Sequence, residues 1–150
     1  MPHIIVLAHK VADIFLRYRK IHRAVFGFHL RSSVAIPGIY REIDHCLYRN
    51  TLAGLRAEIL QIQTALGALQ TEELTTHSSA ELRSTLKQYT DALGETIENL
   101  HTICDRSCTE RQESIIYDTA QCRADKISYD RSLQVQKRLG GKLTELFSRF

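Results

Sequence analysis

Apolar residues in the first thirty positions recur at alternating steps of three and four. This is the heptad pattern of a helix that packs against other helices along one seam. We therefore expect a helix over about residues 3–31, ending where Pro37 and Gly38 interrupt helical structure. The seam is either the core of a bundle or a surface for self-association, and it consists of Ile4, Leu7, Val11, Ile14, Tyr18, Ile21, Val25 and Phe28.

Two further stretches show the same periodicity. A second helix is expected over about residues 39–70, and a third over about 79–105, where Ser78 and Glu81 have the spacing of an N-terminal capping box. Their apolar positions follow the three-four register. In the second helix they are Leu52, Leu55, Ile59, Ile62, Leu66 and Leu69, and in the third Leu82, Leu86, Tyr89, Leu93, Ile97, Leu100 and Cys104.

The end of the third helix is the hardest boundary to place, because no proline or glycine lies between Glu95 and Arg138. Two pairs with capping-box spacing, Ser107 with Glu110 and Thr109 with Gln112, favour a break near residue 106. We expect a fourth helix over about 111–139, which Gly140 and Gly141 end or bend before a short amphipathic segment at 141–150.

Four helices of similar length predict an all-α fold, a four-helix bundle of long antiparallel helices in one domain over residues 1–150. The chain has only two prolines and seven glycines, so turn signals for strands are scarce. A chain of this length buries enough surface to form a core without a metal or a disulfide.

Charge is distributed unevenly along the chain. Residues 1–31 carry six basic side chains against one acid, residues 72–118 have ten acids against four bases, and the last segment is basic again. These segments can neutralise each other inside the bundle. Alternatively, the first helix presents a basic face to an anionic partner, and the candidate residues are Arg17, Arg19, Lys20 and Arg23.

The sequence contains no run of eighteen apolar residues, so it predicts no membrane-spanning helix. Residues 1–36 are arginine-rich and amphipathic, as a mitochondrial presequence would be, but we favour a structural first helix. The expected location is cytoplasmic, with peripheral membrane association as an option.

Two Glu-x-x-His pairs, Glu42 with His45 and Glu98 with His101, have the spacing used by di-iron bundles. The first helix offers only Asp13 as a further ligand, and the helical repeat places Glu98 away from the apolar stripe. The metal hypothesis is therefore not favoured.

His101, Cys104 and Cys108 share a helical face and are the weak candidates for a metal site. The simpler interpretation is that the cysteines pack as small apolar residues of a reduced protein. Phosphate loops, dinucleotide motifs and nucleophile elbows are missing from the sequence. We expect no enzyme activity, no cofactor and no small-molecule substrate.

Residues 6–12 (VLAHKVA), residues 55–66 (LRAEILQIQTAL) and a basic last helix after an acidic third one resemble the N-terminal bundles of HeLo-type cell-death proteins. The bundle of the mixed-lineage kinase-domain-like executioner is similar to these domains. The resemblance implies a non-enzymatic bundle that oligomerises and disrupts membranes through its first helix. Many such domains begin with a glycine-rich apolar segment, whereas this chain has Arg17, Arg19, Lys20 and Arg23, which favours binding at an anionic surface over deep insertion.

The expected function is thus an interaction and self-association module with protein partners or a second copy as its targets, and with anionic membrane as another target. A small basic nucleic-acid-binding subunit is the first alternative, and a metal-binding bundle is the second. The nucleic-acid hypothesis requires one continuous positive surface. Its members would be Arg17, Arg23, Arg31, Arg131, Lys137 and Arg138.

Overall fold

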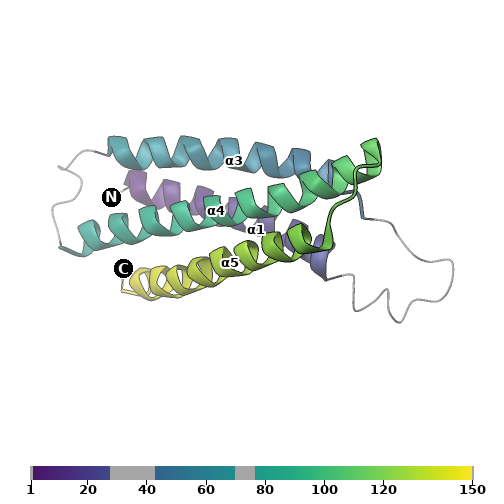
Figure 1. Cartoon of the computed structure of the whole chain (residues 1–150). Helices are drawn as coiled ribbons and strands as arrows, with labels where there is room; N and C mark the ends of the chain where they lie inside the picture. The colour runs from purple at the N-terminus through teal and green to yellow at the C-terminus, as the bar shows by residue number, and fades with distance from the viewer. Residues whose placement is uncertain (1, 28–42, 70–76, 150) are drawn as a thin grey trace.

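The computed structural model describes residues 2–27, 43–69 and 77–149, and these residues form four helices and no strand. The helices are α1 (Pro2–Phe26), α3 (His45–Ala68), α4 (His77–Glu113) and α5 (Thr119–Phe147). Successive helices run in opposite directions, so the start of α1 and the end of α5 lie on the same side of the molecule (Figure 1). The expected all-α four-helix fold is confirmed.

The seam of α1 is the core of a single chain. All seven of its members that lie in the described residues are buried, while Phe28 lies outside the described residues. Burying a large aliphatic side chain contributes about 1.5–3 kcal/mol, so this face holds α1 against the bundle. The seam is therefore not exposed for self-association while the bundle stays folded.

Helix α3 begins at His45, six residues later than the sequence pattern predicted. Residues 39–42 lie outside the described residues, and the side chain of Asp44 caps the helix by accepting a hydrogen bond from the Leu47 amide at 3.0 Å. The expected apolar register is confirmed, because its first five members are buried and Leu69, just beyond the helix end, is half-buried.

Helix α4 is longer than predicted, and the expected break near residue 106 is wrong. The helix continues to Glu113, because its buried stripe extends beyond Cys104 to Cys108, which forms a disulfide with Cys46 at the start of α3. Ser107 and Glu110 therefore lie inside the helix. The chain leaves α4 at Ser114, whose φ of 55° cannot continue a right-handed helix.

Helix α5 begins at Thr119 and continues to Phe147, so the predicted bounds of 111–139 and the separate segment at 141–150 are also wrong. Asp118 provides the N-cap, since its side chain accepts a hydrogen bond from the Ala120 amide at 3.2 Å. Gly140 does not end the helix. A Cβ at this position would lie 3.2 Å from Cε2 of Tyr89, so this glycine allows α5 and α4 to pack closely.

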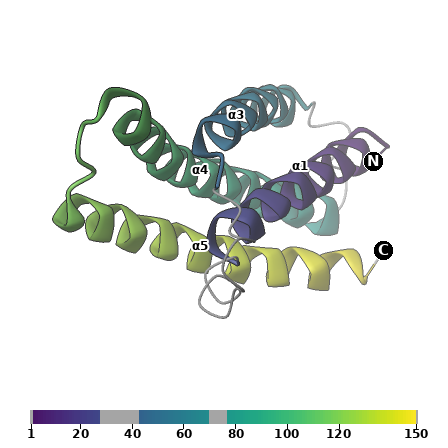
Figure 2. The ribbon, with the colours of Figure 1, turned by 90° about the vertical axis from the view of Figure 1, so that its right-hand side faces the viewer.

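Helix α4 is the central element of the bundle. It packs along both α3 and α5, while α1 lies over α3 and α4. Figure 2 shows α1 crossing the bundle at an angle to α5, and this leaves the two helices apart over much of their length. In the described part of the chain, no helix combines the length and the apolar character needed to cross a membrane.

Candidate functional site

A groove between α1 and α5 lies next to charged residues of both helices. It has a volume of about 690 Å³, within the range of small-molecule sites. We call it the α1–α5 groove. Tyr89 of α4 lies at the floor of the groove, and the walls of the groove are mostly apolar side chains of α1 and α5. These are Ala8, Val11, Ala12, Phe15, Leu133, Leu143 and Phe147.

The groove exists because α1 has a second face beside its core seam. At 100° per residue, Ala8, Ala12, Phe15, Arg19 and Arg23 form a stripe adjacent to the seam. The N-terminal part of this stripe is apolar, whereas its C-terminal part is basic. The groove therefore has chemically different ends.

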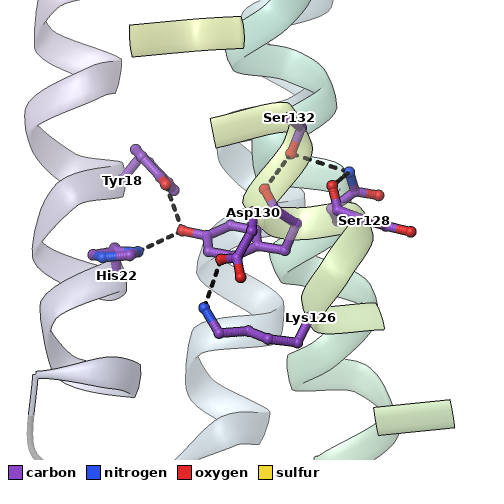
Figure 3. A network of polar contacts seen from close by, with 8 residues as sticks. Tyr18, His22, Lys126, Ser128, Asp130 and Ser132 are labelled. Carbon is purple, nitrogen blue, oxygen red and sulfur yellow. Dashed lines mark hydrogen bonds and ion pairs between the residues drawn. The ribbon is translucent and has the colours of Figure 1, made fainter. Parts of the chain in front are cut away.

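A cluster of three hydrogen-bonded side chains joins the two helices at the basic end. The Tyr129 hydroxyl of α5 lies 2.5 Å from the Tyr18 hydroxyl and 2.5 Å from Nδ1 of His22, both on α1 (Figure 3). A phenol has one proton, so Tyr129 donates in at most one of these bonds, and the tautomer of His22 determines the direction of the other. The rings of His22 and Phe26 also stack on Tyr129. The cluster holds the basic end of the groove closed.

Burial keeps this cluster uncharged. It raises the pKa of Tyr18 to about 12, and it raises the pKa of Tyr129 further, with the neighbouring Tyr18 adding to the effect. Burial also lowers the pKa of His22 below 6.5, helped by the positive charges of Lys126, Lys137 and Arg19 and opposed by Asp130. At neutral pH the cluster is therefore two phenols and a neutral imidazole.

The lowered pKa of His22 predicts that the protein loses stability in mild acid. Below pH 6.5 His22 is protonated in the unfolded chain, whereas in the folded protein it stays neutral until the pH reaches its lower folded pKa. The free energy of unfolding should therefore fall as the pH drops from 6.5 through the folded pKa of His22. His101 contributes in the same direction, because burial and Arg56 lower its pKa despite Asp105. Urea unfolding from pH 8 to pH 5 measures the slope.

The variant His22→Gln should flatten only part of this slope, since His101 remains. The control is His9→Gln, the same substitution at an exposed position of the same helix. A slope that is equal in the His22→Gln variant and the wild type would contradict the assignment.

Three basic side chains from two helices face the groove, namely Arg19 and Arg23 of α1 and Lys137 of α5. Lys20 is exposed beside them on α1. None of the four forms an ion pair with another residue in the described ranges. Three of the four predicted anion-binding residues thus lie at or next to one open groove.

Arg17 differs from the other three. Its Nη1 and Nη2 donate to the two carboxylate oxygens of Glu58 on α3, both at 2.7 Å, and Nη2 also lies 2.8 Å from Asp13. The hydrogen bond from Arg17 lowers the pKa of Glu58. Arg17 therefore fastens α1 to α3, and the expectation that it binds an external anion does not fit this geometry.

The floor of the groove contains a polar atom without a partner. Gln136 is 3% exposed, and its Nε2 donates to the Tyr89 hydroxyl at 3.0 Å, while its Oε1 has no hydrogen-bond partner in the structure. An unpaired buried acceptor costs about 1–3 kcal/mol. The unpaired oxygen therefore offsets part of the stability that the hydrogen bond to Tyr89 contributes.

Comparisons with protein-family models, curated proteins and solved structures find no match to this chain. The resemblance to HeLo-type bundles therefore stays a prediction.

The continuous positive surface required by the nucleic-acid hypothesis is not assembled in the described residues. Arg17 points to α3, and Arg23 and Lys137 share the groove. Arg131 and Arg138 do not line it, and the helical repeat places them about 100–120° from Lys137 around α5. Arg31 lies outside the described residues.

The weak metal candidates do not converge on a site. Cys108 is in the disulfide with Cys46, so the idea that both act as buried free thiols is wrong, and Cys108 has no thiolate to offer a metal. Glu98 lies 3.4 Å from Arg56, and Glu42 lies outside the described residues. The described residues contain no group of three histidine, cysteine or acidic side chains placed to hold a metal ion.

Cys104 keeps the interpretation made from the sequence. It is a buried free cysteine, and burial raises the pKa of its thiol to about 12. A thiol of this kind packs as an apolar residue.

Sequence reasoning missed three residues of this site: His22, Tyr129 and Gln136. It named Lys137 only as part of a surface for nucleic acid. Tyr129, Ser132 and Gln136 are spaced three and four apart and are all buried, so they form the packing stripe of α5. Because the stripe is polar, the apolar periodicity of the sequence does not reveal it.

Proposed function

We propose that this chain is a non-enzymatic interaction module that binds anionic membrane surfaces through Arg19, Lys20 and Arg23 of α1 together with Lys137 of α5. The observation that carries the proposal is that Arg19, Arg23 and Lys137, drawn from two helices, line one open groove with Lys20 exposed beside them on α1, and that none of the four has an acidic partner in the described structure. Each basic residue near an anionic surface contributes about 1 kcal/mol to binding.

Exposed apolar side chains support a membrane as the partner. On α1, Ile5 and Leu16 are 40% and 55% exposed, and the helical repeat places them on the same side of the helix as Arg19 and Arg23. An interfacial helix combines apolar contact with the acyl boundary and basic contact with the headgroups. The seam of α1 is occupied in the core, so this proposal concerns binding at the surface.

Self-association and a role in cell death or signalling, as the resemblance implies, are a further part of the proposal. Because the seam is buried, oligomerisation through it would require α1 to leave the bundle. The hydrogen bonds between Arg17 and Glu58, and those of Tyr18 and His22 with Tyr129, would have to break first.

The disulfide bears on where such contact would occur. Disulfides persist in oxidising compartments and are rare in the cytoplasm. The link between Cys46 and Cys108 therefore favours an oxidising compartment over the cytoplasmic location expected from the sequence. The proposed contact is with a membrane face in that environment.

Reversing three charges tests the proposal. The triple variant Arg19→Glu, Lys20→Glu and Arg23→Glu should keep its helical circular dichroism and lose at least 100-fold in affinity for anionic vesicles, since three contacts of about 1 kcal/mol each are replaced by repulsion. Co-sedimentation with vesicles containing phosphatidylserine, and with neutral phosphatidylcholine vesicles, measures the change.

The matched control reverses Arg131, Arg138 and Lys142, three exposed basic residues of α5 that do not line the groove. It has the same net charge as the first variant and should bind anionic vesicles with an affinity close to that of the wild type. Equal losses in both variants would mean that only net charge matters. Equal binding by the wild type to neutral and anionic vesicles would overturn the proposal.

A further inference from the structure

The shape of the α1–α5 groove restricts what can occupy it. The two helices are hydrogen-bonded to each other at one end, where Tyr129 contacts Tyr18 and His22 at 2.5 Å. A helix with its side chains is about 10–12 Å wide, so a helix could not pass between α1 and α5 at this end without breaking these bonds. At about 690 Å³, the groove fits a slender small molecule better than a protein segment.

The length and polarity of the groove point to an amphiphile. From Ala8 to Arg23 the α1 wall spans 15 residue-to-residue steps, or about 22 Å at 1.5 Å per step. Alanines and large apolar side chains line the end near Ala8, Leu143 and Phe147, whereas the cations lie toward the other end. The small side chains of Ala8 and Ala12 leave room for an alkyl chain between the two helices.

The charge of the groove indicates that the head group of this amphiphile is anionic. Arg19, Arg23 and Lys137 line it, and the groove lining contains no acidic residue among the described side chains. A carboxylate placed beside these cations would gain charge-assisted hydrogen bonds, and guanidinium groups suit its geometry.

We propose that the α1–α5 groove binds one monomeric long-chain carboxylate, with its alkyl chain between Ala12, Phe15 and Leu143 and its head beside Arg19, Arg23 and Lys137. The inference deepens the proposed function, because its anionic head rests on the same cations. It differs in the source of the ligand, which is a free fatty acid and not a lipid within a bilayer.

Calorimetric titration with decanoate, dodecanoate and tetradecanoate, each below the concentration at which it forms micelles, tests the site. Burial contributes about 0.8 kcal/mol per methylene, so each pair of added methylenes should tighten binding about fifteenfold while the chain still fits the groove. One ligand should bind per chain. A binding constant that does not depend on chain length would overturn the inference.

Two substitutions locate the ligand. Ala12→Trp fills the groove from an exposed helix position and should weaken dodecanoate binding at least tenfold. The control is Ala53→Trp, at an exposed position of α3 outside the groove, which should bind as the wild type does. Unchanged binding by a folded Ala12→Trp variant would contradict the assignment, and the circular dichroism of both variants shows that they are folded.

The position of the carboxylate head is tested separately from that of the alkyl chain. Arg23→Gln should weaken binding of dodecanoate and leave binding of dodecanol unchanged, since only the carboxylate uses the cation. A nearby carboxylate should also raise the pKa of His22, which an NMR titration of the imidazole reports. Equal losses for the acid and the alcohol would contradict the placement of the head.

The two proposals can fail independently. The Ala12→Trp variant keeps Arg19, Lys20 and Arg23, so it should still bind anionic vesicles after it has lost dodecanoate binding. If dodecanoate does not bind the wild type but charge reversal abolishes vesicle binding, the groove inference is wrong and the membrane proposal stands. If dodecanoate binds and vesicles do not, the membrane proposal is wrong.

Discussion

Replacing Ile14 with aspartate is expected to unfold the protein. Ile14 lies in the middle of the α1 seam and is 1% exposed, so a carboxylate there would be buried without a partner. The cost is on the order of 4–5 kcal/mol or more, comparable with the whole stability of many small domains. Loss of the cooperative thermal transition, followed by circular dichroism at 222 nm, measures the effect.

The control for this substitution is Leu16→Asp, two residues further along the same helix. Leu16 is 55% exposed, so the same change in chemistry should alter the free energy of unfolding by about 0.5 kcal/mol or less. If Ile14→Asp unfolded no more easily than Leu16→Asp, α1 would be peripheral to the core.

Removing the disulfide should cause the second large loss of stability. The bond between Cys46 and Cys108 closes a loop over a sequence separation of 62, which in the chain-entropy model corresponds to about 4 kcal/mol. We therefore expect the double variant Cys46→Ala and Cys108→Ala to unfold at a much lower urea concentration than the oxidised wild type.

Reduction of the wild type should reproduce this shift, since it breaks the same covalent link. Cys122→Ala is the control, because Cys122 is a free exposed cysteine and its loss should leave the urea midpoint unchanged. Four reactive thiols per chain in the unreduced, unfolded protein would show that the disulfide does not form.

The helices and their buried faces followed from the sequence because periodicity reports burial on a helix directly. The seam of α1 and the stripe from Leu82 to Cys104 in α4 both proved to be buried along their whole described length. The boundaries were less predictable, because capping spacing at Ser107 competes with tertiary contacts. The burial of Cys108 and its bond to Cys46 keep α4 helical past that point.

The candidate site could be predicted only in part. The basic side of α1 was evident, since Arg19, Lys20 and Arg23 lie off the apolar seam. Lys137 and Tyr129, however, are separated from them by more than 100 residues, and only the packing of α5 beside α1 brings them near. Arg17 resembled its neighbours in the sequence, and its different role appears only through Glu58 on α3.

By itself, the sequence determined that the chain forms four amphipathic helices, which face of three of them is buried, and that α1 is basic outside its seam. These properties are local, because each depends on residues within a few turns of one helix. Only the tertiary structure decided which cysteines pair, that α1 and α5 meet around Tyr129, and that cations from both helices share one groove. Those features depend on distances between segments far apart in the chain, and helical periodicity contains no information about them.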